Sequence, residues 1–258
     1  MVAAGLDVPD HLLALAASSH SGEELHLTGV REILGIAGLD ESALQTPVDF
    51  PLDLDERDAW IRDGRSPVAI AMNCSGKHAA MLLTCVINGW PISSYLDPQH
   101  PLQRAVHAQL ELLASEPIGH VGIDGCGAPV MSLTVAGLAR VMSRCVSDEP
   151  GTPARRVADA MAAHPESVGG RRRDVTAFMR AVPGLVAKDG AEGVYIAGLP
   201  DGRAVAIKVE DGSIRARRVA LAAILVGLGC DPRALDEHLR LPLWGGGAVV
   251  GWVESPLT

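Results

Sequence analysis

A thiol, an amine and an imidazole lie close together at the predicted start of an apolar helix. Residues 73–78 read NCSGKH and lead into the apolar run 79–87. The start of a helix presents unpaired N–H groups and the positive end of the helix dipole, which favour a thiolate or a developing oxyanion. Cys74 is therefore a candidate for chemistry, with a small buried hydrophobe as the alternative.

Three lysines occur in the chain, so each one is a separate candidate. Lys208 alternates with apolar residues in a predicted strand and is expected to face solvent. Lys77 and Lys188 both lie near glycines in sequence that is typical of turns. A second cysteine, Cys126, lies between two glycines in residues 124–129 (DGCGAP), where glycine permits a close backbone approach.

Hydrophobic periodicity predicts the elements that must position these residues. A hairpin is expected where a PDGR turn joins two apolar runs. The predicted helices cover residues 9–17, 24–37, 57–63, 75–88, 98–114, 134–144, 153–164, 176–181, 219–228 and 232–239, and the predicted strands cover 121–123, 194–199 and 204–210.

The sequence contains no repeat, low-complexity tract or linker, which predicts a single domain over residues 1–258. The expected fold class is α+β, with helices packed around an antiparallel sheet. One hairpin and one short strand make a small sheet for so many helices, because sheets normally contain more strands. We therefore expect an element that should pair with the hairpin to be missing.

Composition and charge limit the classes of partner and the cellular location that are expected for the chain. The net charge of -9 and the absence of a basic stripe with interleaved aromatics argue against nucleic acid. The run 171–173 (RRR), closed by Asp174, is typical of a solvated or salt-bridged loop. No apolar run approaches the roughly 20 residues that span a membrane, and the acidic start with Asp7 and Asp10 does not resemble a secretory signal. Five widely spaced cysteines then indicate free thiols, and a cytoplasmic location is expected.

Several motifs together resemble a known family. They are residues 19–23 (SHSGE), 73–78, 124–129, 164–165 (HP) and 187–191 (AKDGA). In this order and spacing, from residue 1 to about 251, they resemble the asparaginase II family, the rhizobial-type L-asparaginases. That family is similar in fold to the serine β-lactamases and glutaminases. The resemblance implies a small-molecule substrate, L-asparagine, hydrolysed to L-aspartate and ammonia.

The resemblance also implies roles for individual residues. Ser19 matches the second active-site serine of the family. Lys188 matches a lysine that corresponds to the Lys-Thr/Ser-Gly element of β-lactamases. Cys74, Lys77 and Cys126 match residues that gather a zinc ion, and no organic cofactor is implied. Zn²⁺ prefers thiolate ligands, and lysine must lose a proton to bind it, so such a site should weaken as pH falls.

Three further residues are assigned to the substrate pocket. Asp124 either holds the α-amino group of the substrate or orients the Gly-Cys-Gly loop. Arg173 is a candidate carboxylate clamp, because a guanidinium binds carboxylates through two parallel hydrogen bonds. His78 is a pocket residue, with packing beside the thiol as its alternative. Without the family, the tract at Ser19 is typical of a loop and helix cap, since acidic Glu23 follows at capping distance.

The chain departs from the family at its N-terminal end. Family members carry, upstream of residue 1, two strands and an Arg-Ser-x-x-Lys-Pro segment that supplies the nucleophile and its base. No Ser-x-x-Lys occurs here, because Cys74, Leu185 and Val205 stand three residues before the lysines. We expect a shortened N-terminus, through a mis-chosen start codon or a truncation, with the N-terminal strands missing and activity lowered by orders of magnitude.

These observations leave several functions open. The first is an L-asparaginase-type amidohydrolase. The second is a catalytically inactive homologue that binds zinc or a small molecule, and the third is an amidase acting on another amide such as glutamine. Cys74 and Lys77 could also replace the missing pair as thiol nucleophile and amine. The oligomeric state is open, with a homodimer as one alternative.

Overall fold

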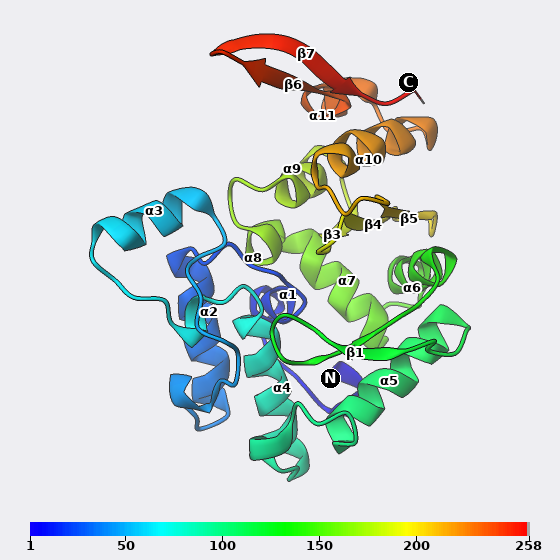
Figure 1. Cartoon of the computed structure of the whole chain (residues 1–258). Helices are drawn as coiled ribbons and strands as arrows, with labels where there is room; N and C mark the ends of the chain where they lie inside the picture. The colour runs from blue at the N-terminus through cyan, green and yellow to red at the C-terminus, as the bar shows by residue number, and fades with distance from the viewer. Residues whose placement is uncertain (257–258) are drawn as a thin grey trace.

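The computed structural model describes residues 1–256 and combines many helices with small antiparallel sheets (Figure 1). The helices are α1 (Asp10–Ala16), α2 (Glu24–Ile36), α3 (Leu54–Arg62), α4 (Ser75–Asn88), α5 (Pro101–Ala114), α6 (Val135–Ser147), α7 (Pro153–Ala163), α8 (Pro165–Gly169), α9 (Asp174–Ala181), α10 (Arg215–Gly227) and α11 (Asp236–Leu239). The strands are β1 (Val121–Ile123), β2 (Pro129–Met131), β3 (Val186–Asp189), β4 (Val194–Gly198), β5 (Ala204–Lys208), β6 (Arg240–Gly245) and β7 (Ala248–Glu254).

The mixture of helices with antiparallel ladders confirms the predicted α+β class. The predicted single domain over residues 1–258 stays a prediction, and residues 257–258 of it lie outside the described part. None of the helices in residues 1–256 has the length and hydropathy needed to cross a membrane.

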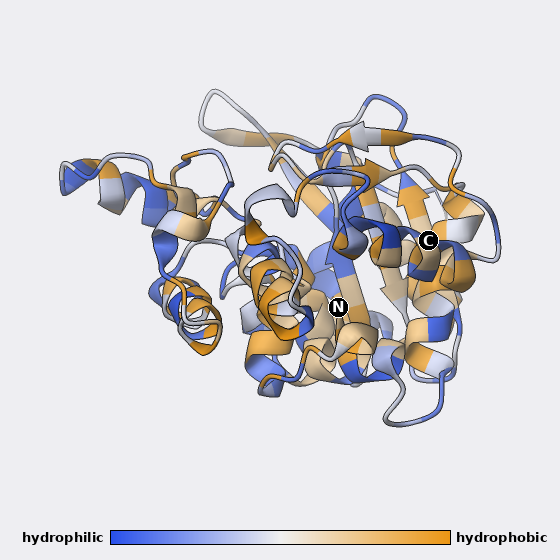
Figure 2. Ribbon diagram, turned by 90° about the horizontal axis from the view of Figure 1, so that it is seen from below, coloured by the Kyte–Doolittle hydropathy of each residue, from blue (hydrophilic) through white to orange (hydrophobic). Residues whose placement is uncertain are grey.

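Helix α1 lies at the centre of the helical part and carries the chain toward Ser19. Its residues Leu12 to Ala16 are buried, and it packs against α2, α4, α7 and α8. Hydrophobic segments gather where these elements meet, as Figure 2 shows in orange. The first turn of α4 approaches α1 closely, because a Cβ on Gly76 would lie 2.7 Å from the carbonyl oxygen of Leu15. Glycine therefore sets the distance between the two helices beside the NCSGKH tract.

The central sheet has the order β3-β4-β5 and holds one of the predicted catalytic residues. Helices α6 and α10 pack on β4 and β5, while α7 and α9 contact β3. Lys188 was predicted in a turn, which is wrong: it lies in β3, opposite Ile196 of β4. The preceding residues Leu185 to Ala187 are all buried, so they form a continuous apolar run without the alternation that marks a half-buried strand. Strand β3 pairs with the hairpin from within the chain, so the expectation that its partner is missing is wrong, whereas the missing N-terminal strands stay a prediction.

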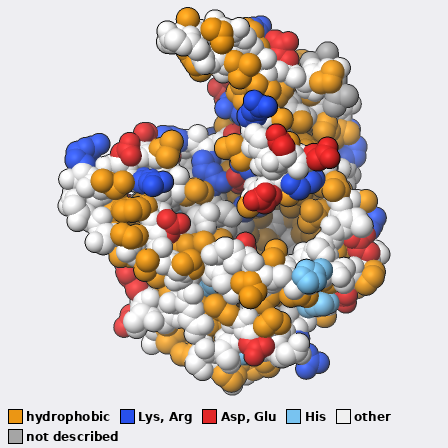
Figure 3. All heavy atoms as spheres, viewed as in Figure 1, with side chains coloured by type: hydrophobic (Ala, Val, Ile, Leu, Met, Phe, Trp, Pro, Cys, Tyr) orange, Lys and Arg blue, Asp and Glu red, His pale blue; other side chains and the backbone are white. Residues whose placement is uncertain are grey.

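The C-terminal part differs most from the prediction. The predicted helix over 232–239 divides into a 3-10 turn, Pro232–Leu235, and the short α11. The hairpin of β6 and β7, which was not predicted, follows it and projects from the body (Figures 1 and 3). Its turn uses Gly246 and Gly247 at positive φ, which glycine adopts without strain.

Several surface predictions are confirmed. Arg172 of the basic run pairs with Asp53 and Glu56 at the start of α3, so the run is part of a salt-bridged loop. This pairing ties the α8–α9 connection to α3, which stands away from the body in Figures 1 and 2. Lys208 is exposed, as expected for the end of an edge strand. All five cysteines are free thiols.

The close contact between α1 and α4 generates a test. We predict that Gly76→Ala lowers the free energy of unfolding by about 1–3 kcal/mol, because the new methyl group meets the backbone of Leu15. Urea denaturation measures the change. Gly35→Ala in α2 is the matched control, since no atom lies within 4 Å of its Cβ position and alanine favours helix. A Gly76 variant as stable as the wild type would contradict the tight contact.

Candidate active site and metal site

The fold brings Ser19 and Lys188 into direct contact. The Lys188 amine lies 2.9 Å from the Ser19 hydroxyl, although 169 positions separate them. Ser19 lies in the connection between α1 and α2, and Lys188 lies near the end of β3. A serine hydroxyl beside an amine is the arrangement that general-base activation of the hydroxyl requires.

A buried carboxylate organises the charges around this pair. Asp189 Oδ2 accepts hydrogen bonds from Arg173 and, at 3.0 Å, from Arg217, while its Oδ1 lies 3.6 Å from the Lys188 amine. Burial works to raise the pKa of Asp189, but Lys188, Arg173 and Arg217 outweigh it and hold that pKa below its usual value. The carboxylate is therefore ionised, with Oδ2 hydrogen-bonded to both arginines and Oδ1 buried without a hydrogen-bond partner.

Burial also sets the protonation of Lys188. Its pKa is lowered, first by burial and then by the positive charge of Arg173, although Asp189 and Cys74 act in the opposite direction. A lowered pKa leaves more of the amine unprotonated near neutral pH. An unprotonated amine can accept the proton of the Ser19 hydroxyl.

Arg173 joins the two sides of this site. One guanidinium nitrogen donates to the carbonyl oxygen of Ser19 and another donates to Asp189. The sequence assigned Arg173 to a carboxylate clamp, and these contacts show that it binds a carboxylate of the chain itself. Its role toward a substrate carboxylate stays a prediction.

His20 anchors the Ser19 loop to the start of α4. Its Nδ1 accepts a hydrogen bond from Gly22 N–H at 3.1 Å, so Nε2 carries the proton that faces Ser75 Oγ at 2.8 Å. Its backbone N–H donates to the carbonyl of Asn73 at 2.9 Å. The sequence analysis did not single out His20, although its position between Ser19 and Ser21 in a family motif was a signal.

The tract at Ser19 is a loop, as its local alternative expected, but Ser19 does not cap a helix, so the helix-cap part of that alternative is wrong. The N-cap of α2 is Glu23, whose side chain and that of His26 form a capping box. Ser21 donates to the carbonyl of Gly169 at 2.6 Å instead. The Ser19 hydroxyl is thereby left facing Lys188.

A second cluster forms where the tracts 73–78 and 124–129 meet. Ligand atoms of Cys74, Asp124 and Cys126 all lie within 4.8 Å of one another. The amine of Lys77 lies 3.3 Å from Cys126 Sγ and 3.6 Å from Asp124 Oδ2. Two sulfurs and a carboxylate oxygen are donors that Zn²⁺ accepts, so this set fits that ion.

The thiols of Cys74 and Cys126 have pKa values that are shifted in opposite directions. The hydrogen bond between them raises the pKa of Cys74, and burial raises it further. The same hydrogen bond lowers the pKa of Cys126, with His78 and Lys77 adding to the effect against burial. Cys126 is thus the thiolate of the pair, which disfavours Cys74 as a nucleophile paired with Lys77.

Lys77 responds to the same charges. Burial works to lower its pKa, but the two cysteines and Asp124 outweigh it and raise that pKa. Without a bound ion, the site therefore favours the protonated amine. Asp124 offers a third donor to the cluster, while its role toward the substrate and that of Lys77 toward a metal stay predictions.

His78 lies beneath this cluster. Its Nδ1 is 2.8 Å from the hydroxyl of Tyr95, and the side chain is fully buried. Its influence on Cys126 matches the predicted packing beside a thiol. A contact of His78 with substrate stays a prediction.

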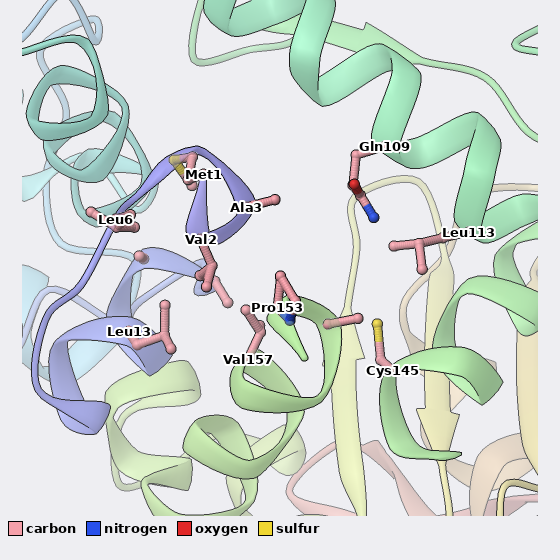
Figure 4. Close-up of a pocket in the computed structure, with 13 residues that line it drawn as sticks. Met1, Val2, Ala3, Leu6, Leu13, Gln109, Leu113, Cys145, Pro153 and Val157 are labelled. Carbon is pink, nitrogen blue, oxygen red and sulfur yellow. The ribbon is translucent and has the colours of Figure 1, made fainter. Parts of the chain in front are cut away.

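An apolar pocket of about 230 Å³ lies elsewhere in the molecule (Figure 4). Its wall includes Met1, Leu13, Leu113, Cys145 and Val157, and it contains none of the predicted site residues. The chemistry-bearing side chains gather outside it, so this pocket is not the candidate active site.

The motifs that carry these contacts agree with a comparison of the whole chain. A profile of the L-asparaginase II family matches residues 1–255. The chain belongs to the L-asparaginase II family. A search of curated protein sequences found no match to it. Membership of the L-asparaginase II family supports a hydrolase of the amidohydrolase type, and it gives no residue of this chain a role.

The buried histidines beside the site predict how stability depends on pH. Burial lowers the pKa of His20 well below its usual value, and it also lowers that of His26. Below about pH 6.5 the unfolded chain therefore binds protons that the folded chain does not, so the free energy of unfolding falls as pH falls.

We predict that His20→Gln flattens this dependence by up to about 1.4 kcal/mol per pH unit between pH 6 and pH 5. Urea denaturation at several pH values measures the slope, in a range where the carboxylates are still largely ionised. Equal slopes for the variant and the wild type would show that His20 takes up a proton in the folded state.

Proposed function

We propose that the chain is an L-asparaginase-type amidohydrolase that converts L-asparagine to L-aspartate and ammonia. The observation that carries the proposal is the 2.9 Å contact between Ser19 Oγ and the buried amine of Lys188. Membership of the L-asparaginase II family supports it. A fold of the serine β-lactamase and glutaminase type is part of the proposal, supported by the place of Lys188 on the edge strand β3.

In this proposal Ser19 and Lys188 move protons at the amide. A nucleophilic oxygen, from the upstream segment of the family or from water, adds to the amide carbon and gives its proton to the Ser19 oxygen, while the Ser19 hydroxyl proton passes to the unprotonated amine of Lys188. The Lys188 ammonium then returns that proton through Ser19 to the leaving nitrogen, the C–N bond breaks, and ammonia departs. Asp189 and Arg173 hold the pair in place, through the carboxylate beside the amine and the hydrogen bond to the Ser19 carbonyl.

The nucleophile of the family belongs to a Ser-x-x-Lys segment, and the printed sequence contains none. Two proteins therefore test the proposal: this chain, and any longer form whose gene places an Arg-Ser-x-x-Lys-Pro segment upstream of it. We expect the longer protein to release ammonia from L-asparagine and the printed chain to be slower by several orders of magnitude. No turnover and no binding of L-asparagine by the longer protein would end the proposal.

Variants of the longer protein test the proton-transfer pair. We predict that Ser19→Ala or Lys188→Met lowers kcat by about 10²–10⁴-fold, because proton transfer at the amide is lost. The rate of the wild type should rise with pH as Lys188 loses its proton, at a pKa below the usual lysine value. Lys208→Met is the control, since Lys208 is exposed on β5, the opposite edge strand of the sheet. An unchanged kcat in either variant would remove the pair from the mechanism.

Competition between L-asparagine and other amides tests which amide is the substrate. If L-glutamine or another amide displaces L-asparagine, the alternative of an amidase with a different substrate is preferred. The cytoplasmic location and the homodimer stay predictions.

The cluster at Cys74, Asp124 and Cys126 favours a second candidate, a homologue that binds zinc without turnover. These three residues would hold Zn²⁺, and the bound ion would supply a positive charge in the candidate active site. We predict that Zn²⁺ raises the melting temperature of the printed chain, and that Cys126→Ser abolishes the effect. Thermal-shift measurements check this, with Cys230→Ser as the control outside the cluster.

The zinc effect should also weaken as pH falls, because the ligands take up protons. Adding L-asparagine or L-aspartate in the same thermal-shift measurements tests for ligand binding. A folded binding protein gives a raised melting temperature, whereas a misfolded chain does not. A melting temperature that Zn²⁺ leaves unchanged would contradict the second candidate.

A further inference from the structure

Arg217 lies against the end of β3, and none of the motifs quoted above includes it. It belongs to the first turn of α10, and its side chain is 9% exposed. Its guanidinium donates to the carbonyl oxygen of Gly190 at 2.7 Å and to Asp189 Oδ2 at 3.0 Å. It also lies over the ring of Tyr195, 5.3 Å from the ring centre.

These contacts close a chain of interactions around the candidate base. Arg173 joins the Ser19 carbonyl to Asp189 Oδ2, and Arg217 joins the same oxygen to the Gly190 carbonyl. The two residues that follow Lys188 are thus fixed by side chain and backbone together. A guanidinium suits this task, because its planar fork can donate to two acceptors at once.

We propose that Arg217 is a positioning residue, which holds the Asp189-Gly190 end of β3 so that the amine of Lys188 stays in contact with the Ser19 hydroxyl. Arg217 itself touches neither side chain of the pair. Its consequence for turnover rests on the proposed function, whereas its effect on Lys188 does not.

Loss of Arg217 should act on Lys188 in one direction. The groups that act on the Lys188 charge are Asp189 on β3, Arg173 at the start of α9 and Cys74 at the start of α4. Without Arg217, one cation fewer balances Asp189, so the carboxylate attracts the Lys188 ammonium more strongly. A loosened strand end also admits water to the amine. Both changes favour the protonated amine and raise the pKa of Lys188.

The experiment uses the printed chain and needs no activity. The lysines are methylated with ¹³C-formaldehyde, and each methyl resonance is followed by NMR as pH changes. Only three lysines are present, so Lys77→Arg and Lys208→Arg assign the Lys188 signal. We expect Arg217→Ala to raise the pKa of Lys188 by about 1 pH unit. Arg215→Ala is the matched control, an exposed arginine two positions away in the same helix.

Arg217→Gln provides a second variant, which removes the charge and keeps a donor for the Gly190 carbonyl. A raised pKa of Lys188 in either folded variant, with no change in Arg215→Ala, supports the proposal. A melting temperature that falls while the pKa of Lys188 stays constant overturns it. Unfolding of both Arg217 variants also overturns it, because it would assign Arg217 to overall stability.

The same variants separate this inference from the proposed function. If the pKa of Lys188 rises in the printed chain but the longer protein never releases ammonia, Arg217 positions Lys188 and the asparaginase proposal fails. If ammonia is released and Arg217→Ala leaves both the pKa and kcat unchanged, only the role of Arg217 fails.

Discussion

The arrangement of the candidate active site depends on one buried carboxylate. Asp189 is 5% exposed, and an ionised carboxylate taken out of water is costly unless cations and hydrogen bonds replace its hydration. Arg173 from the start of α9 and Arg217 from α10 supply the hydrogen bonds and the balancing positive charge, and the Lys188 amine lies 3.6 Å from the other carboxylate oxygen. Because the Asp189 carboxylate must be neutralised and hydrogen-bonded, α9, α10 and the end of β3 meet at this one residue.

The Ser19 loop is held from two sides. Arg173 binds its carbonyl group from the Asp189 side, and His20 binds Ser75 and Asn73 at the start of α4. The start of α4 also carries Cys74, and a negative charge on its sulfur would raise the pKa of Lys188. The candidate metal cluster and the serine–lysine pair are therefore parts of one electrostatic environment, and a change of charge at one is felt at the other.

Features of the fold and the candidate site could be predicted when a local sequence pattern determines them, and were missed when they depend on residues distant in the chain. Helix α4 begins and ends where its sequence predicted, because an apolar run closed by Asn88-Gly89 is a local signal. Family motifs predicted that Ser19 and Lys188 belong to one pocket, and their contact agrees with it. Strand β3 escaped prediction since its burial depends on helices elsewhere in the chain. Arg217 escaped for the same reason, because its partners follow Lys188 and not its own neighbours.

Lys77 and Lys188 show most clearly why residue type alone was not enough. Both amines are partly buried beside a carboxylate, yet burial prevails at Lys188 and lowers its pKa, while two thiols and Asp124 prevail at Lys77 and raise it. The first amine is suited to accept a proton from a hydroxyl. The second is suited to stay charged beside a thiolate, which makes it a poor metal ligand. Lys77 follows a glycine and Lys188 lies two residues before one, so the two are alike in sequence, and only the neighbours gathered by the fold give them opposite chemistry.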